Sequence, residues 1–485
     1  MTIPAALRDL LADMADPSLV GDAVVTGVAL DSRRVAEGDL FLACPGTVRD
    51  GRSFINEALA SGAAAIAYEA EGFDGVPPDA PAIPVEGLAA RVSEIGARFY
   101  DHPSAVLYVI GVTGTNGKTS CVHFLAQALG RLGEKARMIG TLGSGEVGDP
   151  DTGGGLTTPG PLDLQRLLRQ FTDQGTGHVV MEVSSHALRQ GRVSAVEFDA
   201  AVFTNLTRDH LDYHGDIDDY AQAKKSLFRY SSLRFLVANA EDAVGRQILA
   251  DAAVPAVSFG EHGDVAAADL CVEEAGLSMR ITGPGRPLHV SVALVGRVNV
   301  SNVLAVAAVL MQMGYEPAAI EGALNRLSAV PGRMELFRSP GAGPTAVVDY
   351  AHTPDALERA LRSVREHCRG ELWCVFGCGG DRDRGKRREM GRIAEKWADQ
   401  VILTNDNPRS EQPARIVADI LVGMGGEPQV ILDRRRAIIA ALTAARPTDW
   451  VLIAGKGHET SQTIGERVIP FDDREVVSTC LGKAA

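Results

Sequence analysis

The sequence predicts an α/β protein of three domains, built on open and mostly parallel sheets. Three observations predict this class. Short apolar runs alternate with segments of helical periodicity, and most runs end in polar or glycine-bearing segments, as strands do at the ligand-binding edge of a parallel sheet. The length of 485 residues exceeds what one hydrophobic core usually holds. Breaks at Asp101-His-Pro-Ser104 and Val330-Pro-Gly-Arg-Met334 predict domains over residues 1–104, 105–331 and 332–485.

Composition argues against several classes of protein. The net charge of −14 argues against general nucleic-acid binding and does not support a membrane-surface role. No apolar run approaches the roughly 18 residues of a membrane span, and the N-terminus lacks a signal-peptide pattern. Seven scattered cysteines are typical of reduced thiols, and Cys374 and Cys378 lack the second pair that makes zinc binding credible. We expect a cytoplasmic protein with no nucleic-acid partner and no membrane span, acting as a monomer.

Residues 1–104 are expected to form the smaller N-terminal α/β domain. The pattern predicts a strand over Leu40–Ala43 and a short helix over Phe54–Ala60, with Gly62 just beyond its end. The preceding Asp31-Ser-Arg33 is typical of a turn. On residue chemistry alone, Ser32 could simply cap a helix or form that turn.

The segment 106–132 predicts a phosphate-binding loop in the central domain. A buried strand over Val106–Val112 leads into a turn with Gly111, Gly114 and Gly117, and Cys121–Leu132 has helical periodicity. Glycines let backbone N–H groups approach a polyphosphate, while Lys118 can reach the terminal phosphates and the Thr119 hydroxyl can ligate Mg²⁺. The strict pattern has glycine where this chain has Val112, so the loop is a variant, and an ordinary glycine-rich turn is the alternative.

Further strands in the central domain should bring chemical groups to the same edge. Apolar runs at His178–Val183, Ala200–Phe203 and Phe235–Ala238 read as parallel strands. Glu182 ends the first run and is a plausible Mg²⁺ ligand, whereas His210, after the second, could equally be a structural histidine. Asn299 and Asn302 lie three residues apart near the start of a long apolar helix ending near Gly314. One could cap the helix and the other could contact a base or phosphate.

The C-terminal segment repeats the pattern of strands followed by polar loops, which predicts a doubly wound, Rossmann-like domain. Its loops include Gly379-Gly-Asp-Arg382, Asp406-Asn-Pro-Arg409 and Gly455-Lys-Gly-His-Glu459. A dinucleotide-dependent redox enzyme is disfavoured because Gly377-x-Gly-Gly lacks the required spacing and the acid that would contact a ribose. The five expected strands are Ala346–Val348, Leu372–Phe376, Val401–Leu403, Val430–Leu432 and Val451–Ala454.

Taken together, these motifs resemble the Mur ligases over nearly the whole chain. The motifs carrying the resemblance are Thr113-Gly-Thr-Asn-Gly-Lys-Thr119, Glu182-Val-Ser-Ser-His186, Asn205-Leu-Thr-Arg-Asp-His-Leu-Asp212, Gly296-Arg-Val-Asn-Val-Ser-Asn302 and Asp349-Tyr-Ala-His-Thr-Pro354. Asp31-Ser-Arg33, Thr157-Thr-Pro159 and the three C-terminal loops further resemble the branch that adds diaminopimelate. The resemblance implies an ATP-driven amide ligase of peptidoglycan synthesis: ATP phosphorylates the D-glutamate γ-carboxylate, and an amine of diaminopimelate displaces the phosphate.

The resemblance also implies a role for each domain. The N-terminal domain would bind the uridine part of UDP-N-acetylmuramoyl-L-Ala-D-Glu, the central domain ATP, and the C-terminal domain meso-diaminopimelate. Positions matching the family's contacts to the UDP-linked substrate are Leu30, Ser32, Thr47, Val48, Arg49, Thr157, Thr158, Ser184, Gln190 and Arg192. Many relatives have asparagine where this chain has Leu156, so one polar contact is expected to differ.

ATP-binding positions carried over from the family are Gly114, Thr115, Asn116, Gly117, Lys118, Thr119, Ser120, Asn302, Arg333 and Asp349. The residues implied in catalysis are Lys118, Glu182, His210 and Lys224. Thr119 and Glu182 would hold one Mg²⁺ and His210 a second.

In the segment Tyr220–Phe228, the resemblance implies a lysine that CO₂ converts to a carbamate. Its spacing to Tyr220 and Leu227 assigns this N6-carboxylysine to Lys224, with neighbouring Lys225 as the alternative. A carbamate is an anion on a long arm and can reach a Mg²⁺ ion as a ligand. On composition alone, a Lys-Lys pair on a helix is more often a solvated face.

Diaminopimelate differs from lysine by one distal carboxylate, which a guanidinium can bind through two parallel hydrogen bonds. Arg409 and Arg382 suit that task, and Glu459 could receive the distal ammonium. Positions expected at this site are Arg382, Asp406, Asn407, Pro408, Arg409, Gly455 and Glu459.

Three alternative functions fit the motifs less well. Folylpolyglutamate synthase shares the glycine loop and carbamylated lysine, but it leaves Asp31-Ser-Arg33 and Asp406-Asn-Pro-Arg409 unexplained, and these two motifs also disfavour a sister Mur ligase. A nucleotide-binding switch that makes no product is disfavoured by the many acids, histidines and arginines at strand ends.

Overall fold

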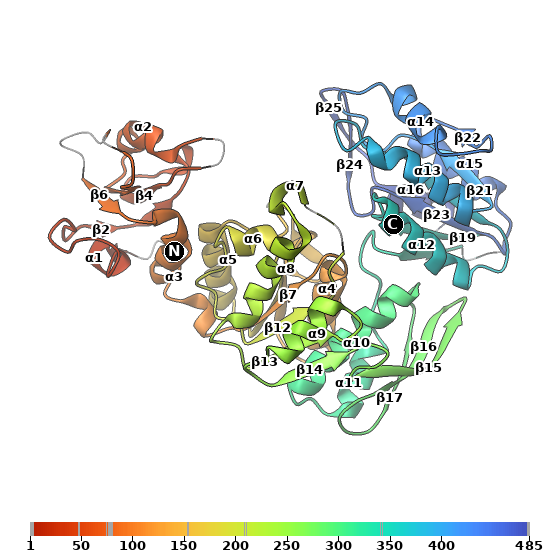
Figure 1. The fold of residues 1–485 in the computed structure, drawn as a ribbon, viewed down its shortest axis with the longest axis horizontal. Helices are drawn as coiled ribbons and strands as arrows, with labels where there is room; N and C mark the ends of the chain where they lie inside the picture. The colour runs from red at the N-terminus through yellow and green to blue at the C-terminus, as the bar shows by residue number, and fades with distance from the viewer. Residues whose placement is uncertain are drawn as a thin grey trace. The chain divides into compact units, whose positions relative to one another are not determined.

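The computed structural model describes residues 4–46, 49–73, 75, 81–152, 155–207, 209, 211–339, 341 and 343–482. The chain packs into two compact units, Met1–Ser258 and Phe259–Ala485 (Figure 1). Three positions expected in the site, Thr47, Val48 and His210, lie outside the described residues. No helix in the described part of the chain is long and apolar enough to cross a membrane.

The first unit begins with a small α/β body around a four-stranded parallel sheet of order β3-β4-β5-β6. Apolar residues of β4 are fully buried between helices on either side. The strand expected at Leu40–Ala43 and the helix expected at Phe54–Ala60 are present, and Gly62 has the positive φ of a helix stop. The elements are β1 Ala5–Ala6, α1 Leu7–Leu10, β2 Val24–Val25, β3 Gly27–Ala29, η1 Ser32–Arg34, β4 Asp39–Ala43, η2 Gly51–Phe54, α2 Ile55–Ala60, β5 Ala65–Glu69, β6 Ala82–Val85, α3 Leu88–Phe99 and η3 Pro103–Ala105.

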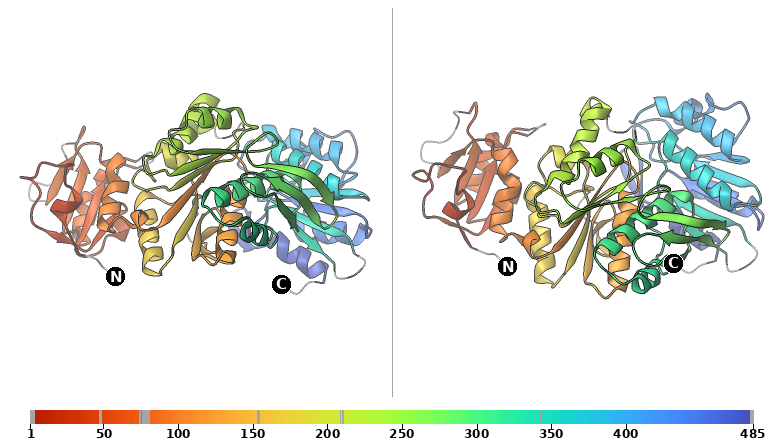
Figure 2. Two further views of the ribbon diagram at one scale, coloured as in Figure 1. Left: turned by 90° about the horizontal axis from the view of Figure 1, so that it is seen from below. Right: turned by 60° about the horizontal axis from the view of Figure 1, so that its bottom comes forward.

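An eight-stranded sheet of order β10-β9-β8-β11-β7-β12-β13-β14 forms the rest of the first unit. Strands β8, β11, β7, β12 and β13 run parallel, and helices cover both faces of the sheet (Figure 2). The elements are β7 Tyr108–Thr113, α4 Lys118–Arg131, β8 Ala136–Gly140, β9 Gly143–Glu146, β10 Asp149–Asp151, α5 Pro161–Asp173, β11 His178–Glu182, α6 Ser185–Arg189, β12 Ala200–Phe203, α7 Leu211–His214, α8 Ile217–Lys225, η4 Ser226–Arg229, β13 Phe235–Asn239, α9 Ala243–Ala250 and β14 Ala256–Phe259.

The strand order puts the chemically active segments at one edge. Glu182, the last residue of β11, lies opposite Val112 of β7, and Phe203 of β12 lies opposite Thr113 on the other side. The phosphate loop therefore emerges between the ends of two neighbouring parallel strands. This is the edge at which open α/β sheets bind ligands.

The second unit contains an antiparallel three-stranded sheet that the sequence reading missed. Residues of β17 alternate between buried and exposed, and most of those in β15 alternate between half-buried and exposed, a period-two pattern typical of a sheet with one covered face. The long apolar helix expected after residue 294 is α10, which is buried from Asn302 to Leu310 and ends before Gly314. The elements are β15 Ala266–Glu273, β16 Gly276–Thr282, β17 Leu288–Val292, α10 Arg297–Gln312 and α11 Pro317–Leu324.

The C-terminal segment forms the expected doubly wound sheet, of order β18-β19-β23-β20-β21-β22, with β18 as the antiparallel edge strand. Phe376 and Leu452 pack on one face of this sheet, whereas Val375 and Ile453 pack on the other. The elements are β18 Glu335–Arg338, β19 Thr345–Asp349, α12 Pro354–His367, β20 Leu372–Phe376, α13 Gly385–Trp397, β21 Gln400–Leu403, α14 Pro413–Leu421, β22 Gln429–Val430, α15 Arg434–Ala444, β23 Trp450–Ala454, β24 Ser461–Ile464, β25 Arg467–Pro470 and α16 Asp473–Cys480.

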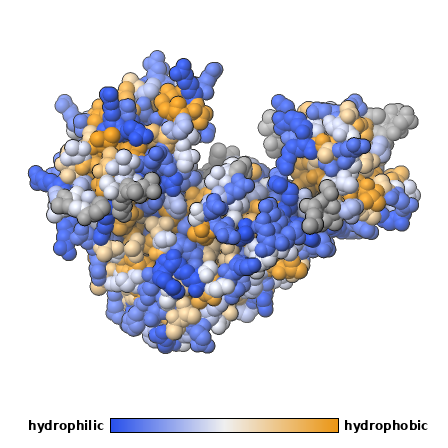
Figure 3. Space-filling model, turned by 180° about the vertical axis from the view of Figure 1, so that it is seen from behind, coloured by the Kyte–Doolittle hydropathy of each residue, from blue (hydrophilic) through white to orange (hydrophobic). Residues whose placement is uncertain are grey.

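Hydrophilic side chains cover most of the molecular face in Figure 3, and hydrophobic residues occur there in small patches. Such scattered apolar residues are normal on globular proteins.

Candidate active site

The phosphate loop is held open by contacts to the segment after β12. The Thr115 N–H donates to the Asn205 carbonyl at 2.7 Å, and the Asn116 N–H donates to Asn205 Oδ1 at 3.0 Å. A Cβ on Gly114, whose φ is 145°, would stand 1.9 Å from Thr204 Oγ1. Only glycine fits there, which is the physical reason for this loop's second glycine.

Helix α4 begins at Lys118, three residues before the expected start, with Gly117 as its N-cap in a left-handed conformation. Lys118 and Thr119 are therefore in the first turn, where N–H groups have no partner within the helix and the helix dipole favours an anion. The Lys118 ammonium donates to the Gly114 and Thr115 carbonyls, both at 2.9 Å.

A second lysine reaches the same carbonyl. Lys224 lies on α8, is 1% exposed, and donates from Nζ to the Gly114 carbonyl at 2.8 Å. Its Nζ also lies 4.4 Å from the centre of the Tyr220 ring. Burial, reinforced by the nearby Lys118 ammonium, lowers the pKa of Lys224 well below its usual value. A lysine in this environment tends to hold a neutral, nucleophilic amine.

Lys225 has different surroundings. Its Nζ lies 3.1 Å from Asp251 and 3.5 Å from Gln247 Oε1, and it makes no contact with the phosphate loop. Of the two neighbouring lysines, Lys224 therefore contacts the phosphate loop and Lys225 forms an ion pair with Asp251.

Glu182 is 1% exposed and keeps its carboxylate at the sheet edge. Oε1 accepts from the Thr141 N–H at 2.8 Å, and Oε2 accepts from the Thr141 hydroxyl at 3.3 Å. A Cβ on Gly140 would stand 2.4 Å from Oε1, so the missing side chain leaves the carboxylate its space. A buried carboxylate that retains lone pairs, near a phosphate loop with a hydroxyl in its first turn, fits the oxygen ligands that Mg²⁺ prefers.

The positions expected to contact the muramoyl-dipeptide form one hydrogen-bonded chain next to Glu182. The Thr158 hydroxyl donates to the Glu182 carbonyl at 2.8 Å and lies 3.3 Å from Ser184 Oγ. Arg192 donates to the Thr158 carbonyl at 3.0 Å and pairs with Gln190 Oε1. The Thr157 hydroxyl lies 3.2 Å from the Thr141 hydroxyl, which links Thr157 to Glu182. The side chain of Leu156 is exposed.

In the N-terminal body, Asp31 rather than Ser32 caps the short helix η1, because its carboxylate accepts from the Arg33 N–H. Hydrogen bonding to the Arg33 guanidinium lowers the pKa of Asp31 to about 2. Ser32 is buried beyond β3, while Leu30 and Arg49 are exposed. Capping therefore does not explain Ser32, and its expected contact with the UDP-linked substrate stays a prediction.

The positions of the second unit that were expected to contact the nucleotide, Asn302, Arg333 and Asp349, lie in different surroundings. The N-cap of α10 is Gly296, so neither Asn299 nor Asn302 caps the helix. Instead, Asn302 Nδ2 donates to Asn299 Oδ1 at 3.1 Å, and Asn299 Nδ2 donates to the Val295 carbonyl. The Arg333 guanidinium stacks 4.4 Å from the centre of the Tyr350 ring. Burial raises the pKa of Asp349, which ends β19 and accepts from the Met334 and Ala351 N–H groups.

Arg382 and Arg409 come together at Gly379. A Cβ on Gly379 would stand 3.0 Å from Arg409 Nη1 and 3.6 Å from Arg382 Cγ. Arg409 donates to the Gly380 carbonyl at 2.8 Å, and its backbone pairs with Ile464 of β24. The loops after β20 and β21 thus bring the Arg409 guanidinium and the aliphatic part of the Arg382 side chain to the same glycine.

The other positions expected at the diaminopimelate site form a second network. Asn407 Nδ2 donates to Glu459 Oε2 at 2.8 Å, and Lys456 Nζ donates to the same oxygen at 2.7 Å. The Gln462 side chain donates to the Asp406 carbonyl at 2.6 Å. A Cβ on Gly455 would stand 2.5 Å from Asp406 Oδ2, so these two positions touch directly.

A buried ion pair is hydrogen-bonded to the starts of the loops that follow β21 and β23. Arg434 on α15 and Asp473 on α16 are completely buried, with Nη2 and Oδ2 2.6 Å apart. The same guanidinium donates to the Asn405 carbonyl at 3.2 Å and the Ala454 carbonyl at 3.0 Å. Those carbonyls immediately precede Asp406 and Gly455, so one side chain holds the bases of both loops.

Four residues of these networks escaped the sequence reading: Thr141, Tyr220, Lys456 and Arg434. Tyr220 and Lys456 belong to quoted motifs, and their fixed spacing to Lys224 and Glu459 was the available signal. Thr141 and Arg434 carry no local signal, because their partners come from distant segments.

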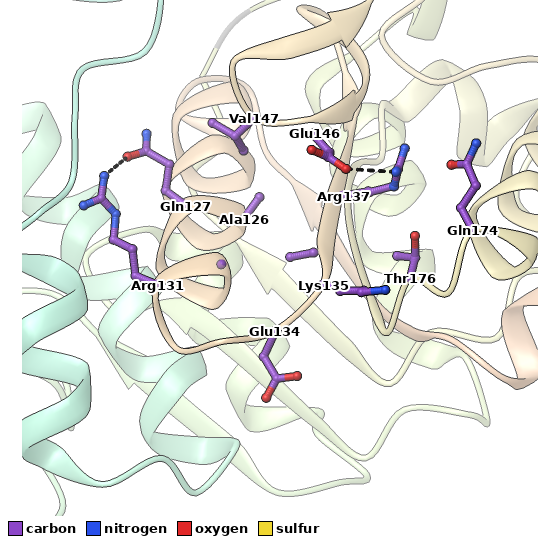
Figure 4. A pocket seen from close by; sticks show the side chains of 12 residues that line it. Ala126, Gln127, Arg131, Glu134, Lys135, Arg137, Glu146, Val147, Gln174 and Thr176 are labelled. Carbon is purple, nitrogen blue, oxygen red and sulfur yellow. Dashed lines mark hydrogen bonds and ion pairs between the residues drawn. The ribbon is translucent and has the colours of Figure 1, made fainter.

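A cavity of about 470 Å³ lies away from all of these positions (Figure 4). Its lining includes Lys135 and Ala136 at the start of β8 and Thr176 shortly before β11. It is therefore at the amino ends of the strands, opposite the phosphate loop. Its most prominent polar contact is the ion pair of Arg137 with Glu146, 3.0 Å apart.

Comparison with known proteins identifies relatives over the whole length. Residues 24–100 match the family description "Mur ligase family, catalytic domain", residues 112–310 match "Mur ligase middle domain", and residues 332–457 match "Mur ligase, glutamate ligase domain". These three matches confirm the three-domain architecture, while the boundaries at 104 and 331 stay predictions.

Two curated relatives are named UDP-N-acetylmuramoyl-L-alanyl-D-glutamate–2,6-diaminopimelate ligase. The protein from Coxiella burnetii is 47% identical, over 97% of this chain and 98% of the relative. The protein from Pseudomonas aeruginosa is 46% identical, over 99% of this chain and 98% of the relative. A solved structure described by the same name is 33% identical, covers 99% of both chains and superposes with a TM-score of 0.75.

Proposed function

The chain belongs to the Mur ligase family of ATP-dependent amide ligases, and from this we propose that it adds meso-diaminopimelate to UDP-N-acetylmuramoyl-L-Ala-D-Glu in peptidoglycan synthesis. The meeting of Arg382 and Arg409 beside Gly379, next to the Asn407–Glu459 network, carries the proposal. Two guanidinium groups suit a distal carboxylate, and a carboxylate suits a distal ammonium. Lysine lacks the group that the arginines would bind.

The reaction has two steps. The D-glutamate γ-carboxylate attacks the γ-phosphorus of ATP, which gives an acyl phosphate and ADP. An amine of diaminopimelate then attacks the acyl carbon, the C–O bond to phosphate breaks, and the attacking nitrogen loses a proton as the amide forms. Lys118 and the N–H groups of the glycine loop hold the phosphates during the first step, because their charge and dipoles are already oriented before charge builds up.

Mg²⁺ ions, when bound, would neutralise charge on the phosphates and on the transferred phosphoryl group. The residues that would hold them are Thr119, Glu182, His210 and the carbamate of Lys224. The buried Glu182 carboxylate, with room beside Gly140, supports this assignment.

Lys224 is proposed as the N6-carboxylysine. Its neutral amine attacks CO₂, and loss of one proton leaves a carbamate anion. The lowered pKa of Lys224 and its contact with Gly114 support this choice, while the ion pair of Lys225 with Asp251 disfavours the alternative.

The remaining assignments follow the family pattern. The N-terminal domain, residues 1–104, binds the uridine side through Leu30, Ser32 and the segment 47–49. The muramoyl-dipeptide lies along the hydrogen-bonded chain that includes Thr158, Ser184 and Arg192. Asn302, Arg333 and Asp349 are the further positions proposed to contact ATP. Because ATP is the energy source, the cytoplasm is the compartment we propose.

Mass spectrometry of the product tests the proposal directly. With ATP, the UDP-linked dipeptide, and diaminopimelate and lysine in competition, the expected product carries diaminopimelate. Phosphate release should require both the acyl substrate and the amine. Steady release of phosphate from ATP alone would favour a nucleotide switch and overturn the ligase assignment.

Replacing Arg409 with alanine should weaken recognition of the distal carboxylate. Hydrogen bonds to charged groups contribute about 1.5–3 kcal/mol, so we expect KM for diaminopimelate to rise about 10- to 100-fold. The preference over lysine should fall by a similar factor in the competition assay. Arg415→Ala, at an exposed arginine on α14, is the matched control and should leave both values unchanged. Full retention of the preference in Arg409→Ala would contradict this account of specificity.

A further inference from the structure

Lys456 has an unusual environment for a lysine. It lies between Gly455 and Gly457, whose positive φ values of 119° and 52° bend the chain after β23. Its side chain is completely buried, whereas the Glu459 side chain is 32% exposed. A buried ammonium is costly unless charged and polar groups compensate it, so its partners define its role.

Those partners are two residues of the proposed diaminopimelate site. Nζ lies 2.7 Å from Glu459 Oε2 and 3.1 Å from Asn407 Oδ1. Asn407 in turn donates to the same Oε2, and its own Oδ1 also accepts from the Thr463 N–H at 3.0 Å. Lysine, asparagine and glutamate therefore form a closed triangle of hydrogen bonds.

The triangle uses the two carboxylate oxygens of Glu459 differently. Oε2 accepts from both Lys456 and Asn407, whereas Oε1 accepts no hydrogen bond from any residue that the structure describes. With Oε2 fixed at two points, the carboxylate cannot rotate without breaking both bonds. Oε1 is the oxygen that remains for a ligand.

We propose that Lys456 is a positioning residue for the incoming amino acid, which locks Glu459 so that Oε1 is presented to the distal ammonium of the substrate. This inference rests on the proposed function and adds to it a residue that does not itself touch the substrate. Oε1 of Glu459 would face the ligand's charge, and Oε2 is held by the protein's own cation.

The same arrangement keeps Glu459 ionised. Burial alone would raise the pKa of Glu459, but the hydrogen bond and charge of Lys456, together with the hydrogen bond from Asn407 and the nearby His458, more than offset it, and the pKa is lowered. Removing the cation should raise this pKa. The carboxylate would then become protonated at a higher pH and lose its attraction for an ammonium.

Lys456→Met tests the proposal, because methionine keeps much of the length and removes the charge. We expect KM for diaminopimelate to rise about tenfold while KM for ATP stays within about twofold. For 2-aminopimelate, which has the distal carboxylate but no distal ammonium, KM should change by less than about twofold. The acid limb of kcat/KM for diaminopimelate should move to higher pH. Lys396→Met, at an exposed lysine on α13, is the control.

A double-mutant cycle with Glu459→Gln completes the test. If Lys456 acts through Glu459, adding Lys456→Met to Glu459→Gln should change KM little. Equal increases in KM for both amino acids, or additive effects in the cycle, would overturn the proposal. Should Lys456→Met fail to fold, Lys456→Gln, which retains a donor without the charge, serves in the same cycle. If the wild-type enzyme forms no diaminopimelate product, the proposed function itself fails, which is a distinguishable outcome.

Discussion

Lys224→Met is expected to lower kcat by about 10²–10³-fold, the usual effect of removing one group that stabilises developing charge. Methionine fills the buried space beside Tyr220 but cannot form a carbamate. The bond to the Gly114 carbonyl is lost as well, so the phosphate loop loses one of its two lysine contacts. Steady-state kinetics with all three substrates measures the loss.

The chain supplies its own control at the next residue. Lys225→Met should leave kcat within about twofold, because Lys225 pairs with Asp251 and makes no contact with the loop. Short carboxylic acids added to Lys224→Ala should restore part of the activity by standing in for the carbamate. Equal losses in both methionine variants, or no loss in either, would show that neither amine is the modified group.

Asp473→Asn should destabilise the second unit by about 3–5 kcal/mol, the range for breaking a buried ion pair by removing one partner. Asparagine is close in shape but leaves the Arg434 guanidinium buried without a counter-charge. All three tryptophans, Trp373, Trp397 and Trp450, lie in the C-terminal segment. Urea unfolding followed by tryptophan fluorescence therefore reports on this part of the chain.

The matched control is an exposed pair on α12. Arg359 and Asp355 lie 3.1 Å apart and are substantially exposed, so Arg359→Gln should cost less than about 0.5 kcal/mol. Since Arg434 also holds Asn405 and Ala454, Asp473→Asn protein that stays folded should show a raised KM for diaminopimelate. If the urea midpoint of Asp473→Asn equals that of Arg359→Gln, the Arg434–Asp473 pair is not required for stability.

The parallel architecture was predictable because most of the expected strands are followed by a loop with its own strong signal. Strands β12 and β20 have the predicted bounds, and β7 and β11 differ from theirs by one or two residues. Helix α4 began earlier than periodicity indicated, since Lys118 and Thr119 are polar residues that belong to its first turn. Glycine spacing, rather than hydrophobicity, marked that boundary.

What could not be predicted depends on contacts between distant segments. The sheet of β15, β16 and β17 has alternating burial, but β15 begins with three alanines and has no fully buried residue, so its local signal is weak. Lys456 reads as an ordinary loop lysine until the fold buries it against Asn407, 49 residues away in sequence. Thr141 likewise gains its role only because β8 lies beside β11. Sequence could therefore nominate Glu182 and Glu459, but not the residues that orient them.

The pairing of Arg409 with β24 has a consequence for engineering and for evolutionary change. The Arg409 N–H donates to the Thr463 carbonyl, its own carbonyl accepts from the Gly465 N–H, and Gln462 holds the Asp406 carbonyl. The loop proposed to recognise diaminopimelate is thus bridged at Arg409 to the edge of the β24–β25 hairpin, and its backbone register is set by residues that follow it by more than fifty positions. If residues 405–411 alone were replaced by those of a relative, their backbone would have to pair with a hairpin of unmatched sequence, and the side chains could be misplaced. Acceptor preference should be exchangeable only when residues 405–411 and 455–470 are transplanted together as one module.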